Sequence, residues 1–290
     1  MNFYLPDFYF NKELNLYLID LMQLHPEYFY NDIRIKAVYG SFPGTIWNGG
    51  RQIPMKTISR IDIDNIIKEF NDRNIGLNFT FTNFLLEENH VYDSYCNLIA
   101  ELAHNNLNSI IINSPILETH LKQKYPNFNY ILSTTKCERN VEAINNYCEK
   151  YDLVVPDYRD VVNPSFLENL KYPNKIELLV NAYCNPACKL REKHYYNLSY
   201  GQLHFTRIHD ETLKCPTRFR SFLESLNFPT VLKVEDLYGK YKDMGFTNFK
   251  IEGRLTHVVD VIESYVYYLV KSEHKDNVRC LLLKNCNSLT

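Results

Sequence analysis

The sequence predicts an α/β fold, a single (β/α)8 barrel of the TIM type that extends over residues 1–290. Short runs rich in β-branched and aromatic residues alternate with segments whose apolar residues recur at spacings of three and four, which predicts parallel strands joined by right-handed crossovers. The length suits eight such units, and no low-complexity linker divides them. An open doubly wound sheet is the alternative, because alternation alone does not show closure.

The predicted strands are short and end in polar or turn-forming residues. They cover residues 35–41, 76–83, 109–114, 130–135, 152–157, 175–182, 230–234 and 248–254. No glycine-rich phosphate loop follows the first of them, which argues against a nucleotide-binding fold.

The predicted helices lie between these strands and carry one apolar face each. They cover residues 60–73, 92–105, 114–125 and 138–151. Residues 193–229 have a less regular pattern, and we expect them to form an excursion on the barrel rim.

Composition limits the classes of function. The net charge of −2 gives no global basic field for nucleic acid or an anionic membrane. The N-terminus lacks a basic leader with an apolar run, and no stretch reaches the roughly 18 apolar residues of a membrane span. We therefore expect a cytoplasmic protein without a membrane partner, in which the eight cysteines are reduced thiols or metal ligands.

Polar side chains stand at the ends of several predicted strands, where parallel barrels carry their chemistry. In residues 248–254, strand alternation points Phe249 and Ile251 outward and leaves Lys250, Glu252 and Arg254 facing the barrel or its mouth.

The same alternation in residues 175–182 points Glu177 and Asn181 inward. Glu177, Glu252 and Arg254 are therefore candidate catalytic residues. A structural ion pair between Lys250 and Glu252 is the alternative, because buried charges need partners.

Further candidates follow other strands. Arg51, in the WNGGR segment, has the fork that binds carboxylates and phosphates, although a simple tight turn fits this segment equally. His194 is a candidate proton shuttle, with a solvated helix position as its alternative. The candidate substrate-binding residues are Asn48, Arg51, Asn83, Asn113, Asn181 and Arg191.

Two cysteines stand four positions apart directly after the sixth predicted strand, at Cys184 and Cys188. Cys215 lies on the same irregular rim, and Cys137 follows the fourth strand with the parity of an inward residue. Thiolates that converge from different loops suit a soft metal centre, so these four are candidate ligands. Zinc fits four cysteines equally well. The alternative without any metal is that these cysteines are buried reduced thiols.

Several of these segments together resemble the collagenase-like peptidase family, peptidase family U32. The resemblance covers roughly residues 105–270 and rests on YILSTT, DLVVPD, the cysteine-bearing IELLVNAYCNPACKLREKHY, and above all FKIEGR followed by a helix with tyrosines. It implies a barrel. It also implies a [4Fe–4S] cluster on four cysteines and oxygen-independent hydroxylation, since several members combine the two while acting on RNA or a quinone precursor.

Two classes of function therefore compete. The first is a barrel enzyme with a [4Fe–4S] cluster that modifies a small molecule or RNA. The second is a non-catalytic accessory protein with structural thiols or metal that presents a surface to a protein partner. A peptidase, as the family label suggests, is the third reading, although no Gly-x-Ser-x-Gly or His-Glu-x-x-His motif supports it.

Overall fold

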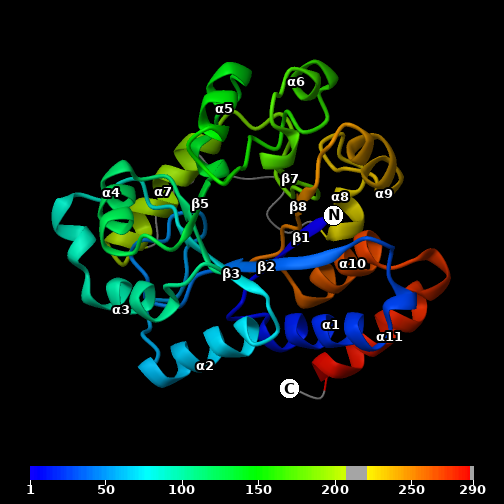
Figure 1. The fold of residues 1–290 in the computed structure, drawn as a ribbon, viewed down its shortest axis with the longest axis horizontal. Coiled ribbons are helices and arrows are strands. Elements are labelled where there is room, and N and C mark those ends of the chain that lie inside the picture. The colour runs from blue at the N-terminus through cyan, green and yellow to red at the C-terminus, as the bar shows by residue number, and fades with distance from the viewer. Residues whose placement is uncertain (207–220, 288–290) are drawn as a thin grey trace.

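The computed structural model describes residues 1–206 and 221–287. Its centre is one sheet of eight parallel strands, with helices around its outside (Figure 1). The strands are β1 (Asn2–Pro6), β2 (Arg34–Gly40), β3 (Gly76–Phe81), β4 (Ser109–Ile112), β5 (Asn129–Leu132), β6 (Leu153–Val154), β7 (Glu177–Leu179) and β8 (Asn248–Lys250).

The sheet closes into a barrel. Its strand order is β6-β5-β4-β3-β2-β1-β8-β7, so β6 and β7 are the two ends of the hydrogen-bonded row. A parallel bridge between Val154 and Ile176 joins these ends. The predicted (β/α)8 barrel is confirmed, and the open doubly wound alternative is wrong.

The helices vary in length, from short turns to the 13 residues of α1, α7 and α11. They are α1 (Lys12–Leu24), α2 (Arg60–Asn71), α3 (Ser94–Ala103), α4 (Pro115–Lys124), α5 (Val141–Cys148), α6 (Pro164–Glu168), α7 (Arg191–Leu203), α8 (Phe222–Ser225), α9 (Val234–Asp236), α10 (Val258–Leu269) and α11 (Lys275–Asn287). Side-chain caps start several of them; the Ser114 hydroxyl, for example, accepts a hydrogen bond from the Leu117 amide at the start of α4.

Strand alternation divides the side chains between two layers. Outward residues such as Leu178 and Phe249 join the large core between barrel and helices. Inside the barrel, a small apolar cluster lies below the mouth and consists of Tyr4, Ala37, Tyr39, Ile111, Ile131 and Val155. The predicted inward orientation of Glu177 and Lys250 is confirmed, because the two side chains meet inside the barrel.

Two strand predictions differ from the structure. Residues 230–234 do not form a strand: Leu232 donates one backbone hydrogen bond to Val180, and its own carbonyl accepts a hydrogen bond from Tyr268 of α10. The apolar character of this segment reflects its burial beneath α10. The eighth strand is instead β1 at the N-terminus, where Phe3 and Leu5 are fully buried.

The predicted rim excursion at residues 193–229 lies in part outside the described residues. Its described portion contains most of α7 and all of α8. Asn83, which follows β3, donates a hydrogen bond to the Ser199 carbonyl and so ties α7 to the barrel. Within the ranges 1–206 and 221–287, no helix is long and apolar enough to cross a membrane.

Candidate functional site

A cavity of about 380 Å³ lies at the carboxyl ends of the strands. Its walls come from β2, β3, β4, β7 and β8, from the segments that follow β5, β6 and β7, and from the first turn of α7. Charged and thiol side chains on these walls are Arg51, Cys184, Cys188, Lys189, Arg191, His194, Lys250, Glu252 and Arg254. The expected end of the barrel therefore carries a pocket.

Arg254 is held in the cavity wall by neutral groups. Its Nη1 donates to the Thr80 Oγ1 at 2.8 Å, and its guanidinium carbon lies 5.5 Å from the centre of the Tyr39 ring. A Cβ added to Gly50 would lie 3.0 Å from the Arg254 Nη2, so the glycine allows the loop to approach the guanidinium. Among the described residues, no carboxylate forms an ion pair with Arg254.

Two ion pairs hold the other inward charges of β7 and β8. The Lys250 Nζ lies 2.6 Å from the Glu177 Oε1, and both side chains are almost fully buried. Glu252 pairs instead with Arg51, from the loop after β2. The alternative of an ion pair between Lys250 and Glu252 is therefore wrong, because Lys250 pairs with Glu177 on the neighbouring strand and Glu252 pairs with Arg51.

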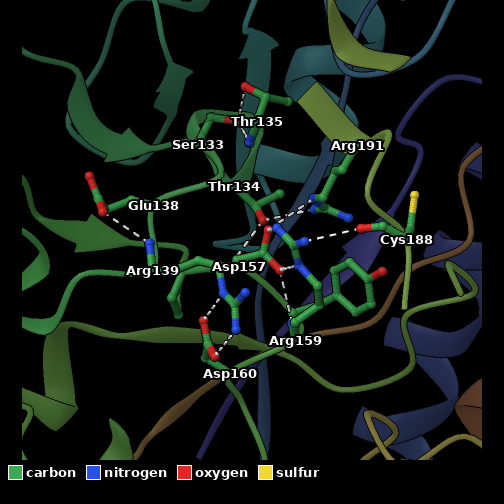
Figure 2. A network of polar contacts seen from close by, with 12 residues as sticks. Ser133, Thr134, Thr135, Glu138, Arg139, Asp157, Arg159, Asp160, Cys188 and Arg191 are labelled. Atoms are coloured by element: carbon green, nitrogen blue, oxygen red, sulfur yellow. Dashed lines mark hydrogen bonds and ion pairs between the residues drawn. The ribbon is translucent and has the colours of Figure 1, made fainter. Parts of the chain in front are cut away.

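Asp157, which follows β6, is the centre of a second charged network (Figure 2). Both of its carboxylate oxygens accept hydrogen bonds from Arg159, at 2.8 and 2.9 Å. The Arg191 Nε lies 3.3 Å from Asp157, while the Arg191 Nη2 donates to Thr134. One buried carboxylate thus serves two guanidinium groups.

Arg191 is positioned as much by aromatic rings as by Asp157. Its guanidinium carbon lies 4.4 Å from the Tyr158 ring centre and 4.9 Å from that of Tyr195. Stacking on ring faces favours a guanidinium, which is weakly hydrated, over an ammonium at this place. Arg191 therefore presents a fixed positive charge at the cavity wall.

His194, one turn after the start of α7, also lines the cavity. Burial lowers the pKa of its imidazole to about 4, and the charges of Arg51 and Arg191 act in the same direction. The ring is therefore neutral at neutral pH. The neutral ring can accept a hydrogen bond from a bound molecule, while the positive charges around it make it a weak base.

Two of the four candidate metal ligands, Cys184 and Cys188, line the cavity. Their loop is held from beneath, since Tyr158 donates to the Asn185 carbonyl and Arg159 to the Cys188 carbonyl. Cys137 ends a 3-10 turn after β5 in a left-handed conformation, with φ 54°.

Burial and the charge of Arg191 act in opposite directions on the pKa of the Cys137 thiol. Burial raises this pKa, and the nearby charge of Arg191 opposes the increase. Arg191 also lies near Cys184, so its charge offsets that of thiolates at both places. In the part of the chain that the structure describes, no three His, Cys, Asp or Glu side chains form a group that could hold a metal ion. Cys215 lies outside that part.

Several predicted substrate-binding residues are not among those that line the cavity. Asn181 bridges β7 and β8, because its side chain bonds both the amide and the carbonyl of Glu252. Asn83 fastens α7, and Asn113 donates to Thr135. Asn48 is fully buried and donates to the Arg51 carbonyl. These amides fix the loops that carry the charged residues.

Sequence reasoning missed some groups that shape the site. Tyr39 and Thr80 point inward from β2 and β3 and hold Arg254. Arg159 follows β6 by a few residues in the PDYRD segment, and this basic residue beside a strand-end aspartate was an available signal. The position of Tyr195 over Arg191 depends on how α7 docks, for which the sequence carries no local sign.

Comparisons with known proteins bear on the fold. No family model matches the sequence, and no curated protein matches it either. The structure is similar to a solved one described as "The Structure of the U32 Peptidase Mk0906", with a TM-score of 0.53 and 12% sequence identity over 88% of this chain and 92% of that chain. At this identity the likeness shows the fold alone. The chain thus has the barrel fold of a U32 peptidase structure, as its sequence resemblance predicts.

Proposed function

We propose that this protein is a barrel enzyme that modifies a small anionic molecule in the cavity at the strand ends. The observation that carries the proposal is Arg254, a half-buried guanidinium at the cavity wall that forms an ion pair with no described carboxylate. A guanidinium in this state can bind carboxylate or phosphate, because the charge is already positioned and in part shielded from water.

The charges around the cavity support the same ligand class. Arg51 and Lys250 each have one carboxylate, but Asp157 is shared between Arg159 and Arg191. Positive charge therefore exceeds negative charge at the walls. The enclosed volume of about 380 Å³ is that of a small-molecule site, which favours a small molecule over an RNA as the substrate.

The proposal includes a [4Fe–4S] cluster on Cys137, Cys184, Cys188 and Cys215, with zinc as the alternative metal. Two of these thiols open onto the cavity beside Arg191, which supports a thiolate-bound group next to the substrate. Such a cluster supplies electron transfer or a binding position for substrate. The residues of this chain would then bind the anion through Arg254 and move a proton at the His194 ring. Hydroxylation without oxygen is the reaction type that the family resemblance suggests.

Arg254→Ala is expected to weaken the binding of benzoate, a carboxylate with an apolar ring, about ten- to a hundredfold, since hydrogen bonds to a charged group contribute about 1.5–3 kcal/mol. Ligand-observed NMR gives the dissociation constants. The melting temperature should stay close to that of the wild type, because no ion pair is broken. Arg279→Ala, which removes an arginine bound to Glu263 on the outer helices, is the control and should bind benzoate normally. Equal affinity of the wild type and the Arg254 variant would contradict the anion site.

Cys184→Ser or Cys188→Ser is expected to abolish iron and acid-labile sulfide in protein purified without oxygen. Cys148→Ser is the control, because this thiol is buried in the core beside α5 and away from the cavity. Iron and sulfide assays with visible absorbance measure the result. Bound zinc without sulfide would show that the site holds zinc and not an iron–sulfur cluster. Colourless, metal-free protein that still binds benzoate through Arg254 would refute the metal centre and leave the proposed anion site intact.

A peptidase is the second candidate function, favoured by the description of the similar structure as a U32 peptidase. A cleavage assay with denatured collagen and casein separates it from the first. The accessory-protein alternative predicts that neither benzoate binding nor cleavage is observed while a protein partner co-purifies.

A further inference from the structure

Lys250 is a primary amine on the wall of the cavity, and neither the anion site nor the thiols account for it. It is the last residue of β8, and strand alternation turns it into the barrel. Its side chain is 7% exposed, and that of its partner Glu177 is 0% exposed. The Nζ lies 4.1 Å from the centre of the Tyr39 ring, on the ring that also carries Arg254.

The surroundings of this amine favour its neutral form more than water does. Burial lowers the pKa of Lys250, while Glu177 opposes the shift by its charge and its hydrogen bond. The charge of Arg254 acts with burial, and that of Glu252 acts against it. Tyr39 faces the amine with its ring, and the Tyr39 hydroxyl donates a hydrogen bond to the Ile251 carbonyl at 2.7 Å. Lysines in such sites serve as nucleophiles toward carbonyl carbons.

We propose that Lys250 forms a protonated Schiff base with an aldehyde or ketone that bears an anionic group, and that Arg254 binds this anionic group. The geometry places the two functions together, because the amine and the guanidinium lie over the same Tyr39 ring. The inference rests on the proposed function only in that the cavity is the active site; it does not depend on the cluster.

The reaction balances with groups that the structure supplies. The Lys250 ammonium passes one proton to the Glu177 carboxylate, which lies 2.6 Å away, and the free amine attacks the carbonyl carbon. The C–O bond of the resulting carbinolamine then breaks, and the oxygen leaves as water with two of the three ammonium protons. The third proton stays on the iminium nitrogen.

Charge conservation suits this site. The ammonium at the start and the iminium at the end carry the same single positive charge, so Glu177 keeps a cationic partner in both states. A buried carboxylate left without one would be strongly unfavourable. The pair that stabilises the barrel interior is therefore compatible with covalent chemistry at its lysine.

The test uses two probes on the wild-type protein, each with a reductant that fixes an imine as a stable amine. Pyruvate with cyanoborohydride presents a ketone with a carboxylate, and pyridoxal 5′-phosphate with borohydride presents an aldehyde with a phosphate. Peptide mapping by mass spectrometry locates the adducts. We expect Lys250 to be modified by at least one probe, and the identity of that probe distinguishes carboxylate from phosphate substrates.

Two variants support the assignment. Lys250→Arg should lose this adduct, and Lys12→Arg, which changes a surface lysine paired with Glu69, should keep it. Mapping of the wild type needs neither variant to fold.

Adducts of both probes on other lysines, with Lys250 unmodified, would overturn the inference and show that the amine is locked in its ion pair. Benzoate has no reactive carbonyl, so its binding tests the anion site alone. Benzoate binding that depends on Arg254, together with an unmodified Lys250, therefore refutes the Schiff base and retains the proposed function. If benzoate does not bind but Lys250 is modified, the proposed anion site is refuted and the Schiff base is retained.

Discussion

Glu177→Ala is expected to lower the free energy of unfolding by about 3–5 kcal/mol, since it leaves the Lys250 ammonium buried without its partner. Both side chains are almost fully buried inside the barrel, so water replaces the lost carboxylate poorly. Without Glu177 to oppose it, burial lowers the pKa of Lys250 further in the folded variant, whereas the unfolded chain keeps the amine protonated up to a pKa of about 10.4. Because the unfolded state then binds more protons, the stability of the variant should rise as the pH rises toward that value. Urea denaturation at several pH values measures both effects.

Two controls separate burial from the mere loss of an ion pair. Glu69→Ala breaks the Lys12–Glu69 pair, whose side chains are 23% and 38% exposed, and should cost less than about 1 kcal/mol. The double variant Glu177→Leu with Lys250→Met removes both charges and should recover most of the stability. Losses of similar size for Glu177→Ala and Glu69→Ala would show that the interior of the barrel is hydrated.

Strand alternation predicted the direction of the charged residues in β7 and β8 but not their partners. Direction depends on the two-residue period of a strand, which is local to the sequence. The partner depends on the register between strands: Glu177 lies opposite Asn248, so its side chain reaches Lys250, two residues further along the neighbouring strand β8. Register follows from packing of the whole sheet, and no single segment determines it.

The two errors in strand placement have a common cause. Residues 230–234 have the composition of a strand because Val231, Leu232 and Val234 are buried, and burial alone selects apolar residues in any conformation. β1 has equally apolar residues, but it is only five residues long, and its first residues lie at the edge of the sequence, where alternation of strands and helices gives it no context.

The cavity itself could be predicted only in part. Its position at the strand ends follows from the barrel, and Glu252 and Arg254 follow from alternation. The wall formed by Arg191, His194 and Tyr195 depends on how α7 docks over the mouth, through contacts such as that of Ser199 with Asn83. The sequence analysis interprets the asparagines at strand ends as binding residues, but in the structure their side chains hold loops in place.

Asp157→Ala is expected to lower the free energy of unfolding by about 3–5 kcal/mol, as it leaves Arg191 buried with no carboxylate. Asp157 is fully buried, and the Arg191 side chain is 6% exposed, so neither group can exchange its partner for water. Arg159, whose side chain is 19% exposed, can turn toward solvent and adds less to the loss. Thermal or urea denaturation measures the change.

The neighbouring pair of Asp160 and Arg139 provides the matched control. Asp160 is nearly as buried as Asp157, but the Arg139 side chain is 51% exposed and regains water when its partner is removed (Figure 2). Asp160→Ala should therefore cost clearly less than Asp157→Ala. Equal losses would show that the buried carboxylate, and not the stranded guanidinium, determines the effect.

The pH dependence gives an independent check on the same network. Burial by itself would raise the pKa of Asp157, but the hydrogen bonds of Arg159 and the charge of Arg191 outweigh burial and lower it below its usual 3.8. A carboxylate with a lowered folded-state pKa stabilises the protein fully above its unfolded pKa of about 3.9, and this contribution is lost as the pH falls through the folded value. The stability difference between wild type and Asp157→Asn should therefore be constant at neutral pH and shrink only below about pH 4. A difference that already shrinks between pH 7 and 5 would mean that the arginines do not hold this carboxylate in its charged form.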